Sequence, residues 1–387
     1  MSTTMTETAD TARTTETDQT AGAAPASAAH AASAGLDPTA AFADRMMGAA
    51  LGWFDLMAVH LGSQLGWYAA LSQADGLTAG ELAARTSTDA RYAREWLEQQ
   101  AASGILRADD ATDAEARRFR LADGVAEVLL DRDSLSYLEP LARMAAASSA
   151  QLDALLEAYR AGGGVSWEQL GAHAREAQAD MNRPWFAQLP ALFAGVERLD
   201  EVLRRPAARI ADLGAGGGWS SIALAQAYPG LRVVGFDVDE ASVEMARRNA
   251  ADAGVADRVE FLLSDAALVA AQGPFDGVFA FECLHDMPHP VEVLAAARAA
   301  VGDGGVVVIM DEASGEEFAQ DANELERLLY GFSLFVCLPD GMAHRPSAGT
   351  GTVMRPATLR GYARAAGWSD VRVVIPEFGL WRFYEIV

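Results

Sequence analysis

From Ala208 onward the sequence alternates short apolar runs with helical patterns. Apolar runs of this kind, linked by segments long enough for a helical crossover, are typical of a parallel sheet covered on both faces. Two further runs follow a last helical pattern and flank a turn at Phe378 and Gly379, which predicts an antiparallel hairpin at the sheet edge. The seven runs are ARIADLG, LRVVGFDVD, VEFLLSDA, FDGVFAFE, GGVVVIMDE, VRVVIPE and LWRFYEIV. The sequence therefore predicts an α/β domain over residues 205–387.

The first part of the chain is polar and acidic. Residues 1–38 lack the basic flank and apolar core of a signal peptide, and we expect a disordered tail there. The formal net charge of −24 disfavours nucleic acid as a partner, because affinity for phosphate backbones comes from Lys and Arg. Cys283 and Cys337 are too few for a disulfide framework, which favours a reducing, cytoplasmic compartment.

A long apolar stretch runs from Met46 to Leu71. Asp55, His60 and Gln64 interrupt it, so we expect a helix pair in the core or at a subunit interface instead of a membrane span.

Residues 39–135 read as a winged-helix domain. Three short helical segments, LGWYAALSQADG, LTAGELAARTS and DARYAREWLEQQAASGIL, precede RRFRLADGVAEVLL, which alternates like a small β-wing. Arg91 and Arg94 could face DNA, but the same helix carries Asp89, Glu95 and Glu98. We therefore expect a solvated face and not a DNA-reading helix.

Residues 136–204 are helical in pattern and form a connector. Met144, Trp185 and Phe186 could roof a substrate pocket, as could Phe335 further along the chain. Packing in the helix core is the alternative for each of them.

The first run of the sheet ends in a glycine-rich turn, ADLGAGGGWSSIALAQAYPG, that leads directly into a helix. Trp219 stands where a dinucleotide fingerprint needs its third glycine, and no Lys follows as a phosphate loop requires. The turn instead has the spacing D-x-G-x-G-x-G, with Asp212, Gly214, Gly216 and Gly218.

This turn resembles motif I of class I S-adenosylmethionine-dependent methyltransferases, whose loop holds the methionine part of the cofactor. The resemblance implies a Rossmann-like seven-stranded methyltransferase sheet, S-adenosyl-L-methionine as cofactor and S-adenosyl-L-homocysteine as product. It also implies that Asp237 binds the ribose hydroxyls, that Asp265 and Ala266 meet the adenine, and that Phe281 lies near the cofactor.

The resemblance extends from about residue 40 to the end. A winged helix, a helical connector and a methyltransferase domain are similar to small-molecule O-methyltransferases of plants and bacteria, including an actinobacterial group. In such proteins the N-terminal part dimerises, so a homodimer is implied.

The segment FAFECLHDMPHPVEVL places polar side chains directly after an apolar strand. CLHDM resembles the His-Asp pair of plant-type O-methyltransferases, which makes His285 a candidate general base with Glu282, Asp286 or Glu312 as the group that orients it. Two alternatives stay open, in which His285 only orients the substrate or is structural.

Several other side chains could contribute to the same pocket. His285 and His289 have a spacing that could hold a metal, but Pro288 and Pro290 make a continuous helical turn there doubtful, and no metal is expected. Trp219 could offer an aromatic face to the sulfonium, with packing as the alternative. Cys337, His344 and Arg355 could reach the pocket from a Gly- and Pro-rich loop.

We therefore expect a small-molecule methyltransferase of specialised metabolism that methylates oxygen with His285 as base. A C- or N-methyltransferase that uses His285 only for orientation, and a winged-helix regulator that senses S-adenosylmethionine without turnover, are the alternatives.

Overall fold

The computed structural model describes residues 37–387. The predicted disordered tail lies almost wholly outside the described residues. Residues Met46–Val387 form one compact unit.

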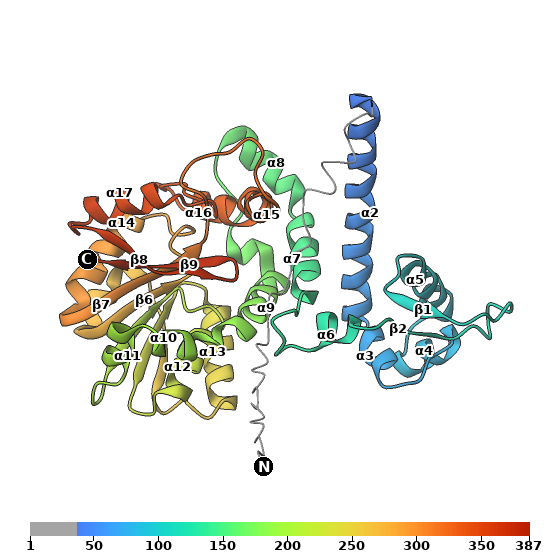
Figure 1. Ribbon diagram of the computed structural model, residues 1–387, viewed down its shortest axis with the longest axis horizontal. Coiled ribbons are helices and arrows are strands. Elements are labelled where there is room, and N and C mark those ends of the chain that lie inside the picture. Colours follow the sequence, from blue (N-terminus) through green and yellow to red (C-terminus); the bar gives the residue numbers. More distant parts are fainter. Residues whose placement is uncertain (1–36) are drawn as a thin grey trace, which may run out of the picture. The chain divides into compact units, whose positions relative to one another are not determined.

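Helices and one small hairpin make up the N-terminal part of the chain (Figure 1). The elements are α2 (Pro38–Gln64), α3 (Trp67–Ser72), α4 (Ala79–Thr86), α5 (Ala90–Ala102), β1 (Leu106–Ala108), β2 (Phe119–Leu121) and α6 (Val125–Leu130). Gly66, with a positive φ of 70°, separates α2 from α3, so the apolar stretch forms the expected helix pair. Within residues 37–387, no helix joins enough length to enough apolar sequence to cross a bilayer.

The predicted wing was only partly right. We expected residues 117–130 to form it alone, but Phe119–Leu121 pairs with the earlier strand Leu106–Ala108, and Val125–Leu130 is a helix. Gly124, with a positive φ of 82°, ends the extended backbone at that point and starts the helical turn.

The connector consists of α7 (Glu139–Ser149), α8 (Leu152–Ala161), α9 (Trp167–Phe186), α10 (Leu189–Ala194) and α11 (Glu197–Leu203). A capping box at Ser166 and Gln169 starts α9. Arg143 of α7 binds Glu139 on its own helix and lies 3.0 Å from Asp180 of α9, and this buried ion-pair network fixes α7 against α9. The helix α9 leads from this ion-pair network toward the sheet domain.

The sheet has seven strands in the order β5-β4-β3-β6-β7-β9-β8. Five are parallel and the last two form the predicted antiparallel edge hairpin. The strands are β3 (Arg209–Leu213), β4 (Arg232–Asp237), β5 (Val259–Leu263), β6 (Phe275–Phe281), β7 (Val301–Glu312), β8 (Val371–Phe378) and β9 (Trp381–Ile386). The other elements of this domain are α12 (Trp219–Ala227), α13 (Glu240–Asp252), η1 (Ala266–Gln272), α14 (Pro290–Ala300), α15 (Glu324–Phe332), η2 (Ser333–Cys337), α16 (Leu338–Ala343) and α17 (Pro356–Ala365).

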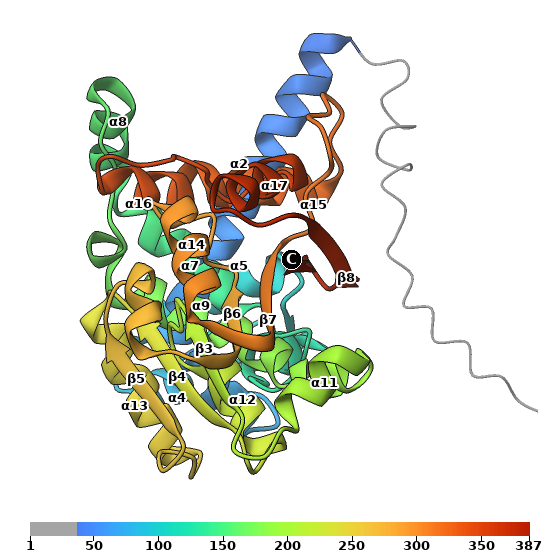
Figure 2. The same cartoon turned by 90° about the vertical axis from the view of Figure 1, so that its left-hand side faces the viewer.

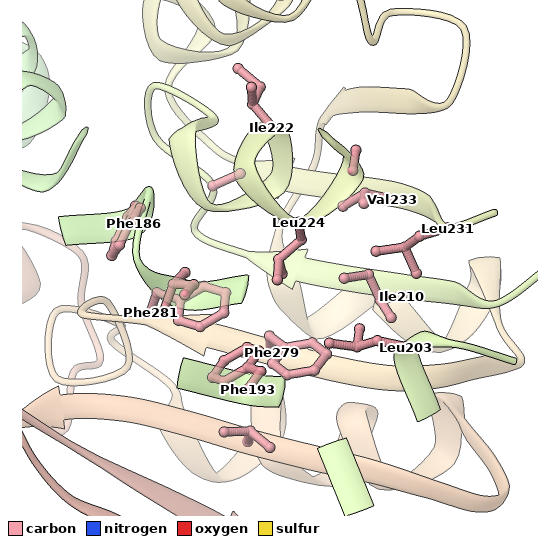
Figure 3. Packing of buried hydrophobic residues seen from close by; sticks show 14 of the residues in the cluster. Phe186, Phe193, Leu203, Ile210, Ile222, Leu224, Leu231, Val233, Phe279 and Phe281 are labelled. Carbon is pink, nitrogen blue, oxygen red and sulfur yellow. The ribbon is translucent and has the colours of Figure 1, made fainter. Parts of the chain in front are cut away.

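Successive strand residues point to opposite faces, and each face has its own core. One core joins the sheet to α10–α13 and the other joins it to η1, α14 and α17, so that helices lie on both sides (Figures 1 and 2). In the first core Phe193 of α10 stacks on Phe279 and Phe281, with ring centroids 5.8 and 6.4 Å away (Figure 3). This aromatic stack holds the end of β6, where the polar segment begins.

The stack should contribute strongly to stability. Phe193→Ala removes a fully buried ring that touches Phe279, Phe281 and Phe383, so we expect a loss of about 3–5 kcal/mol in the free energy of unfolding, measured by urea denaturation. Phe318→Ala is the control, because that ring is 72% exposed and its loss should cost little. Equal effects of the two substitutions would contradict this role of the stack.

Candidate functional site

The glycine turn between β3 and α12 has the backbone that its sequence predicts. Gly214, Gly216 and Gly218 all have positive φ, at 65°, 51° and 79°. A Cβ on Gly214 would lie 2.8 Å from Cys283, and one on Gly218 would lie 2.5 Å from the ring of Phe261. A Cβ on Gly216 would meet nothing within 4 Å, so the turn is packed at its two ends and open at its middle.

Asp212, which precedes this turn, is hydrogen-bonded to the helix that follows the turn. It is 1% exposed and accepts hydrogen bonds of 2.6 Å from the hydroxyls of Ser220 and Ser221, at the start of α12. Burial raises the pKa of Asp212 to about 6, although the two hydroxyls oppose that shift. The sequence pattern marked Asp212, whereas the serine partners were missed and are visible only as WSS after the glycines.

Asp237 and Asp265 end the next two strands, at the same edge of the sheet as the glycine turn. The carboxylate of Asp237 accepts the backbone N–H of Gly216 at 2.8 Å and that of Asp239 at 2.9 Å. Asp265 is exposed and caps η1 by accepting the N–H of Ala267, while Ala266 is buried beside it. The structure thus brings both predicted aspartates to the edge where ligands of open α/β sheets bind.

The helix α9 lies against the glycine turn. Arg175 pairs with Asp239 through two contacts of 2.5 and 3.0 Å, and a Cβ on Gly217 would lie 2.8 Å from Ala179. The guanidinium of Arg183 lies 4.9 Å from the ring centroid of Trp219. One face of Trp219 is therefore covered by an arginine, which favours packing over the expected contact with a sulfonium.

The other aromatic and apolar candidates lie in the core, except for Phe335. Phe281 is 5% exposed, and its ring contacts Phe186 and Phe193 at the helix layer (Figure 3). The alternation of β6 turns that ring toward α10, so the expectation that Phe281 lies near the cofactor stays a prediction about the end of this strand and not about an exposed ring. Trp185 packs on Phe378 and Trp381.

Two more predicted substrate residues are Met144 of α7 and Phe335 of η2. Met144 is 2% exposed in a small core that also contains Val165 and Val336, whereas Phe335 is 43% exposed. The structure does not bring these residues together: Met144 belongs to this small core, Trp185 packs against the core of the sheet, and Phe335 belongs to neither.

His285 lies in a buried group of carboxylates. Its Nδ1 is 2.9 Å from Asp311 and 3.2 Å from Glu312, and its Nε2 is 3.3 Å from Asp286. His285, Asp311 and Glu312 are 1%, 1% and 4% exposed. The sequence pointed to Asp286 and Glu312 but missed Asp311, which ends β7 as an acidic residue after IM and could have been noticed there.

The charge of His285 follows from this environment. Burial alone would lower the pKa of His285, but attraction to Asp286, Asp311 and Glu312 outweighs it and raises the pKa well above 6.5. Burial also raises the pKa of Glu312 well above its ordinary value and raises that of Asp286, while His285 opposes both shifts. His285, Asp286 and Glu312 therefore each hold a proton more tightly than the same side chains would in water.

Glu282 faces a different set of partners. Its backbone has a positive φ of 53° at the end of β6, a conformation that costs energy for a residue with a side chain. One carboxylate oxygen accepts from Asn182 at 2.8 Å and from Gln178 at 3.2 Å, both on α9. Burial raises the pKa of Glu282 to about 7, so this carboxyl group also titrates near neutrality.

A helical segment covers His285. The first part of the Gly- and Pro-rich loop that we expected is helical, as η2, a π-helical turn, and α16, whereas residues 344–355 form a loop as expected. The backbone N–H of Gly351 bonds to the carbonyl of His285 at 3.2 Å, and Val165 bonds to Pro339 at 3.0 Å, which ties this cover to the connector. Cys337 does reach the site, because its sulfur lies with His285 and Asp286 in one group.

The remaining candidates lie elsewhere. Arg355 binds Glu326 and Tyr330, and His344 follows α16. His289 precedes α14. Among the described residues, two groups of side chains lie close enough together to share an ion, namely His285–Asp286–Cys337 and His285–Asp311–Glu312. His289 belongs to neither group.

Comparison with known proteins now identifies the two domains. Residues 205–340 match a family described as a methyltransferase domain, and residues 54–130 match one described as an Rv2258c-like winged HTH domain. The chain therefore combines a winged-helix domain with a methyltransferase domain, which confirms the resemblance that the sequence motifs carried.

Three relatives illustrate the range of similarity. A ubiquinone biosynthesis O-methyltransferase of Ralstonia nicotianae is 29% identical over 41% of this chain and 62% of its own length. The 27-O-demethylrifamycin SV methyltransferase of Amycolatopsis mediterranei is 33% identical over 36% of this chain and 53% of its own length. Human N-acetylserotonin methyltransferase, solved in complex with SAM, is 18% identical with a TM-score of 0.59 over 91% of this chain and 98% of that one, which shows a shared fold.

The carboxylates should control the charge of His285. Asp311→Asn removes a negative charge 2.9 Å from Nδ1, so we expect the pKa of His285 to fall by about one unit or more, measured by NMR titration of the imidazole. Asp303→Asn, at the exposed start of the same strand, is the control and should leave that pKa unchanged. An unaltered pKa of His285 in Asp311→Asn would show that the carboxylate does not hold the proton.

Proposed function

We propose that this protein is an S-adenosyl-L-methionine-dependent methyltransferase that transfers a methyl group to an oxygen of a small molecule. The observation that carries the proposal is the contact between the glycine turn and the segment of His285. Gly214 leaves room for Cys283, and Met287 lies 3.6 Å from the same point, so residues 283–287 pack directly against the predicted cofactor loop. A bound methyl donor and a proton-accepting group would thus be neighbours.

The residues at this edge fit the cofactor. Gly216 faces open space at the middle of the turn, and Asp237 stands beside it with a carboxylate that the backbone already orients. Gly214, Gly216 and Gly218 would hold the methionine part, Asp237 the ribose hydroxyls, and Asp265 with Ala266 the adenine. When bound, the cofactor supplies an electrophilic methyl group on a sulfonium and is released as S-adenosyl-L-homocysteine.

The protein itself positions the acceptor, excludes water and accepts the proton that the acceptor hydroxyl loses. A hydroxyl attacks more readily as it loses its proton, so a base beside it is useful for O-methylation. His285 is the group we assign, with Nδ1 oriented by Asp311 and Glu312 and with Nε2 on the side of Asp286 and Cys337. The cover formed by η2 and α16 keeps this space poor in water.

The raised pKa of His285 sets a condition on this role. A general base has to be neutral before it takes a proton, and the carboxylates favour the imidazolium. The proton that leaves His285 can pass to Glu312 or Asp286, whose own pKa values are raised by burial. We infer that the acceptor's proton is shared across this group and does not rest on imidazole alone.

The three predicted parts of the chain would divide the work. Residues 39–135 form the dimerisation domain, residues 136–204 roof the acceptor pocket through α9, and residues 205–387 bind the cofactor. Small acceptors of specialised metabolism in the cytoplasm fit this arrangement. The names of the two curated relatives, an O-methyltransferase and an enzyme for an O-demethyl compound, support oxygen as the target.

Turnover should depend on His285 and not on its neighbour. His285→Gln removes the base but keeps a hydrogen-bonding group, so we expect methyl transfer to fall by about 10²-fold or more, with S-adenosyl-L-homocysteine affinity nearly intact by calorimetry. His289→Gln is the matched control and should keep its activity, since His289 lies outside the carboxylate group. Labelled methyl transfer into extracts of the producing organism supplies the assay.

Two results would change the proposal. If His285→Gln retained full turnover, the reaction would need no base, and N- or C-methylation with His285 as orienting group would replace O-methylation. If the cofactor bound without any methyl transfer to a small molecule, the sensing regulator would replace the enzyme.

A stripe of exposed apolar residues on α2 supports the homodimer. Met47, Leu51, Phe54 and Leu61 are 63%, 59%, 58% and 54% exposed and follow the spacing of a coiled-coil seam. We expect light scattering to show a dimer for the wild type and a monomer for the double variant Leu51→Lys, Phe54→Lys. Phe318→Lys, on another exposed ring, should remain dimeric, and a monomeric wild type would contradict the assignment.

A further inference from the structure

A cavity lies far from the glycine turn, at the opposite ends of the strands. It has a volume of about 550 Å³ and opens where β4 and β5 begin, under the last turns of α13. The strand β4 starts at Arg232 in this cavity and ends at Asp237 beside the glycine turn, so roughly 16 Å of strand separates the two places. The cavity is therefore not part of the site described above.

Arginines dominate the lining of this cavity. Its charged residues are Arg209, Arg232, Arg247 and Arg258 together with Asp257 and Glu260. Four guanidinium groups against two carboxylates make the place locally positive, in a chain with a formal net charge of −24. Like charges that line one cavity repel each other, and a bound anion would reduce that repulsion.

Two of the arginines have partners within the fold. Arg247 donates from Nε and from its terminal nitrogen to the carbonyl of Phe261, at 3.2 and 2.7 Å, and so satisfies a carbonyl of the edge strand β5. Arg209 donates to the carbonyl of Gln272 and lies 4.3 Å from the ring centroid of Phe275. These two side chains are held in place and help to shape the wall of the cavity.

The other two arginines are available to a ligand. No hydrogen-bond partner for the side chain of Arg258 is found within residues 37–387, and its contact with the carboxylate of Asp257, whose side chain is 78% exposed, is 4.0 Å long. Such an exposed contact between neighbours is worth little. Arg232 is exposed, and no side-chain partner for it is found within residues 37–387.

We propose that this arginine-lined cavity is a binding site for a small phosphorylated molecule, separate from the methyl-transfer site. A guanidinium whose terminal nitrogens have no acceptor within the fold is the feature that an oxyanion would satisfy, and the planar fork of Arg matches phosphate oxygens with two parallel hydrogen bonds. The volume of about 550 Å³ lies within the range of small-molecule pockets and exceeds what one phosphate fills. Arg232 and Arg258 bind the ligand, while Arg209 and Arg247 keep the wall positive.

The charge of this cavity predicts how many phosphate groups the preferred ligand has. With two free guanidinium groups, a ligand with two linked phosphates should bind more tightly than inorganic phosphate, because both groups can be engaged at once. Binding should weaken with added salt, since the cavity is partly open to solvent.

The test uses the full-length protein with inorganic pyrophosphate as probe, and with inorganic phosphate and sodium chloride at matched ionic strength. By calorimetry we expect pyrophosphate to bind at least tenfold more tightly than phosphate, and the double variant Arg232→Gln, Arg258→Gln to lose at least tenfold in affinity. Arg372→Gln, on an exposed arginine of β8, is the matched control and should bind as the wild type does. A nucleoside diphosphate in a parallel titration tells whether a free diphosphate or a nucleotide is preferred.

Three outcomes would overturn the proposal. Pyrophosphate could fail to bind the wild type beyond the effect of chloride, the double variant could bind as well as the wild type, or a short DNA duplex could compete for the same arginines and bind more tightly. The single variant Arg232→Gln guards against misfolding of the double variant, because Arg232 is exposed and its replacement leaves the core untouched. Retained affinity for S-adenosyl-L-homocysteine shows that each variant is folded, so failure here and failure of the methyl-transfer proposal are distinguishable.

Discussion

The close approach of two strand ends at Gly214 is the constraint on which the site depends. A Cβ at that position would lie 2.8 Å from Cys283, so only glycine lets the segment after β6 pack against the turn after β3. Since β3 and β6 are neighbours in the sheet, this contact joins the open loop around Gly216 to the buried group around His285. This one close contact therefore positions both the predicted cofactor loop and the proposed base.

The sheet also positions the carboxylates that surround His285. Asp311 and Glu312 end β7, beside β6, and reach Nδ1 of His285 from the strand end. Burial makes each carboxylate costly when it is alone, and the imidazolium offsets that cost. The cover formed by η2 and α16 completes the enclosure, and the bond from Val165 to Pro339 links it to the connector.

The sequence predicted the sheet and the glycine turn at its edge well, because those features follow from local rules. Buried parallel strands are apolar throughout, and positive φ at Gly214, Gly216 and Gly218 demands glycine. Other features depend on contacts between distant segments. Asp311 reaches His285 only through strand pairing, Phe281 turns into the core because of the alternation of β6, and the strand at Leu106–Ala108 pairs across a long loop. The arginine-lined cavity could not be foreseen, because its arginines come from four separate places in the chain.

The central claim is that residues 283–287 face the methyl donor. A crystal structure of the protein with S-adenosyl-L-homocysteine tests it most directly. The account predicts the ribose hydroxyls on Asp237, the amino-acid part on the glycine turn, and the sulfur on the side of His285 and Asp286. A nucleoside bound elsewhere, or a sulfur turned away from His285, would contradict it.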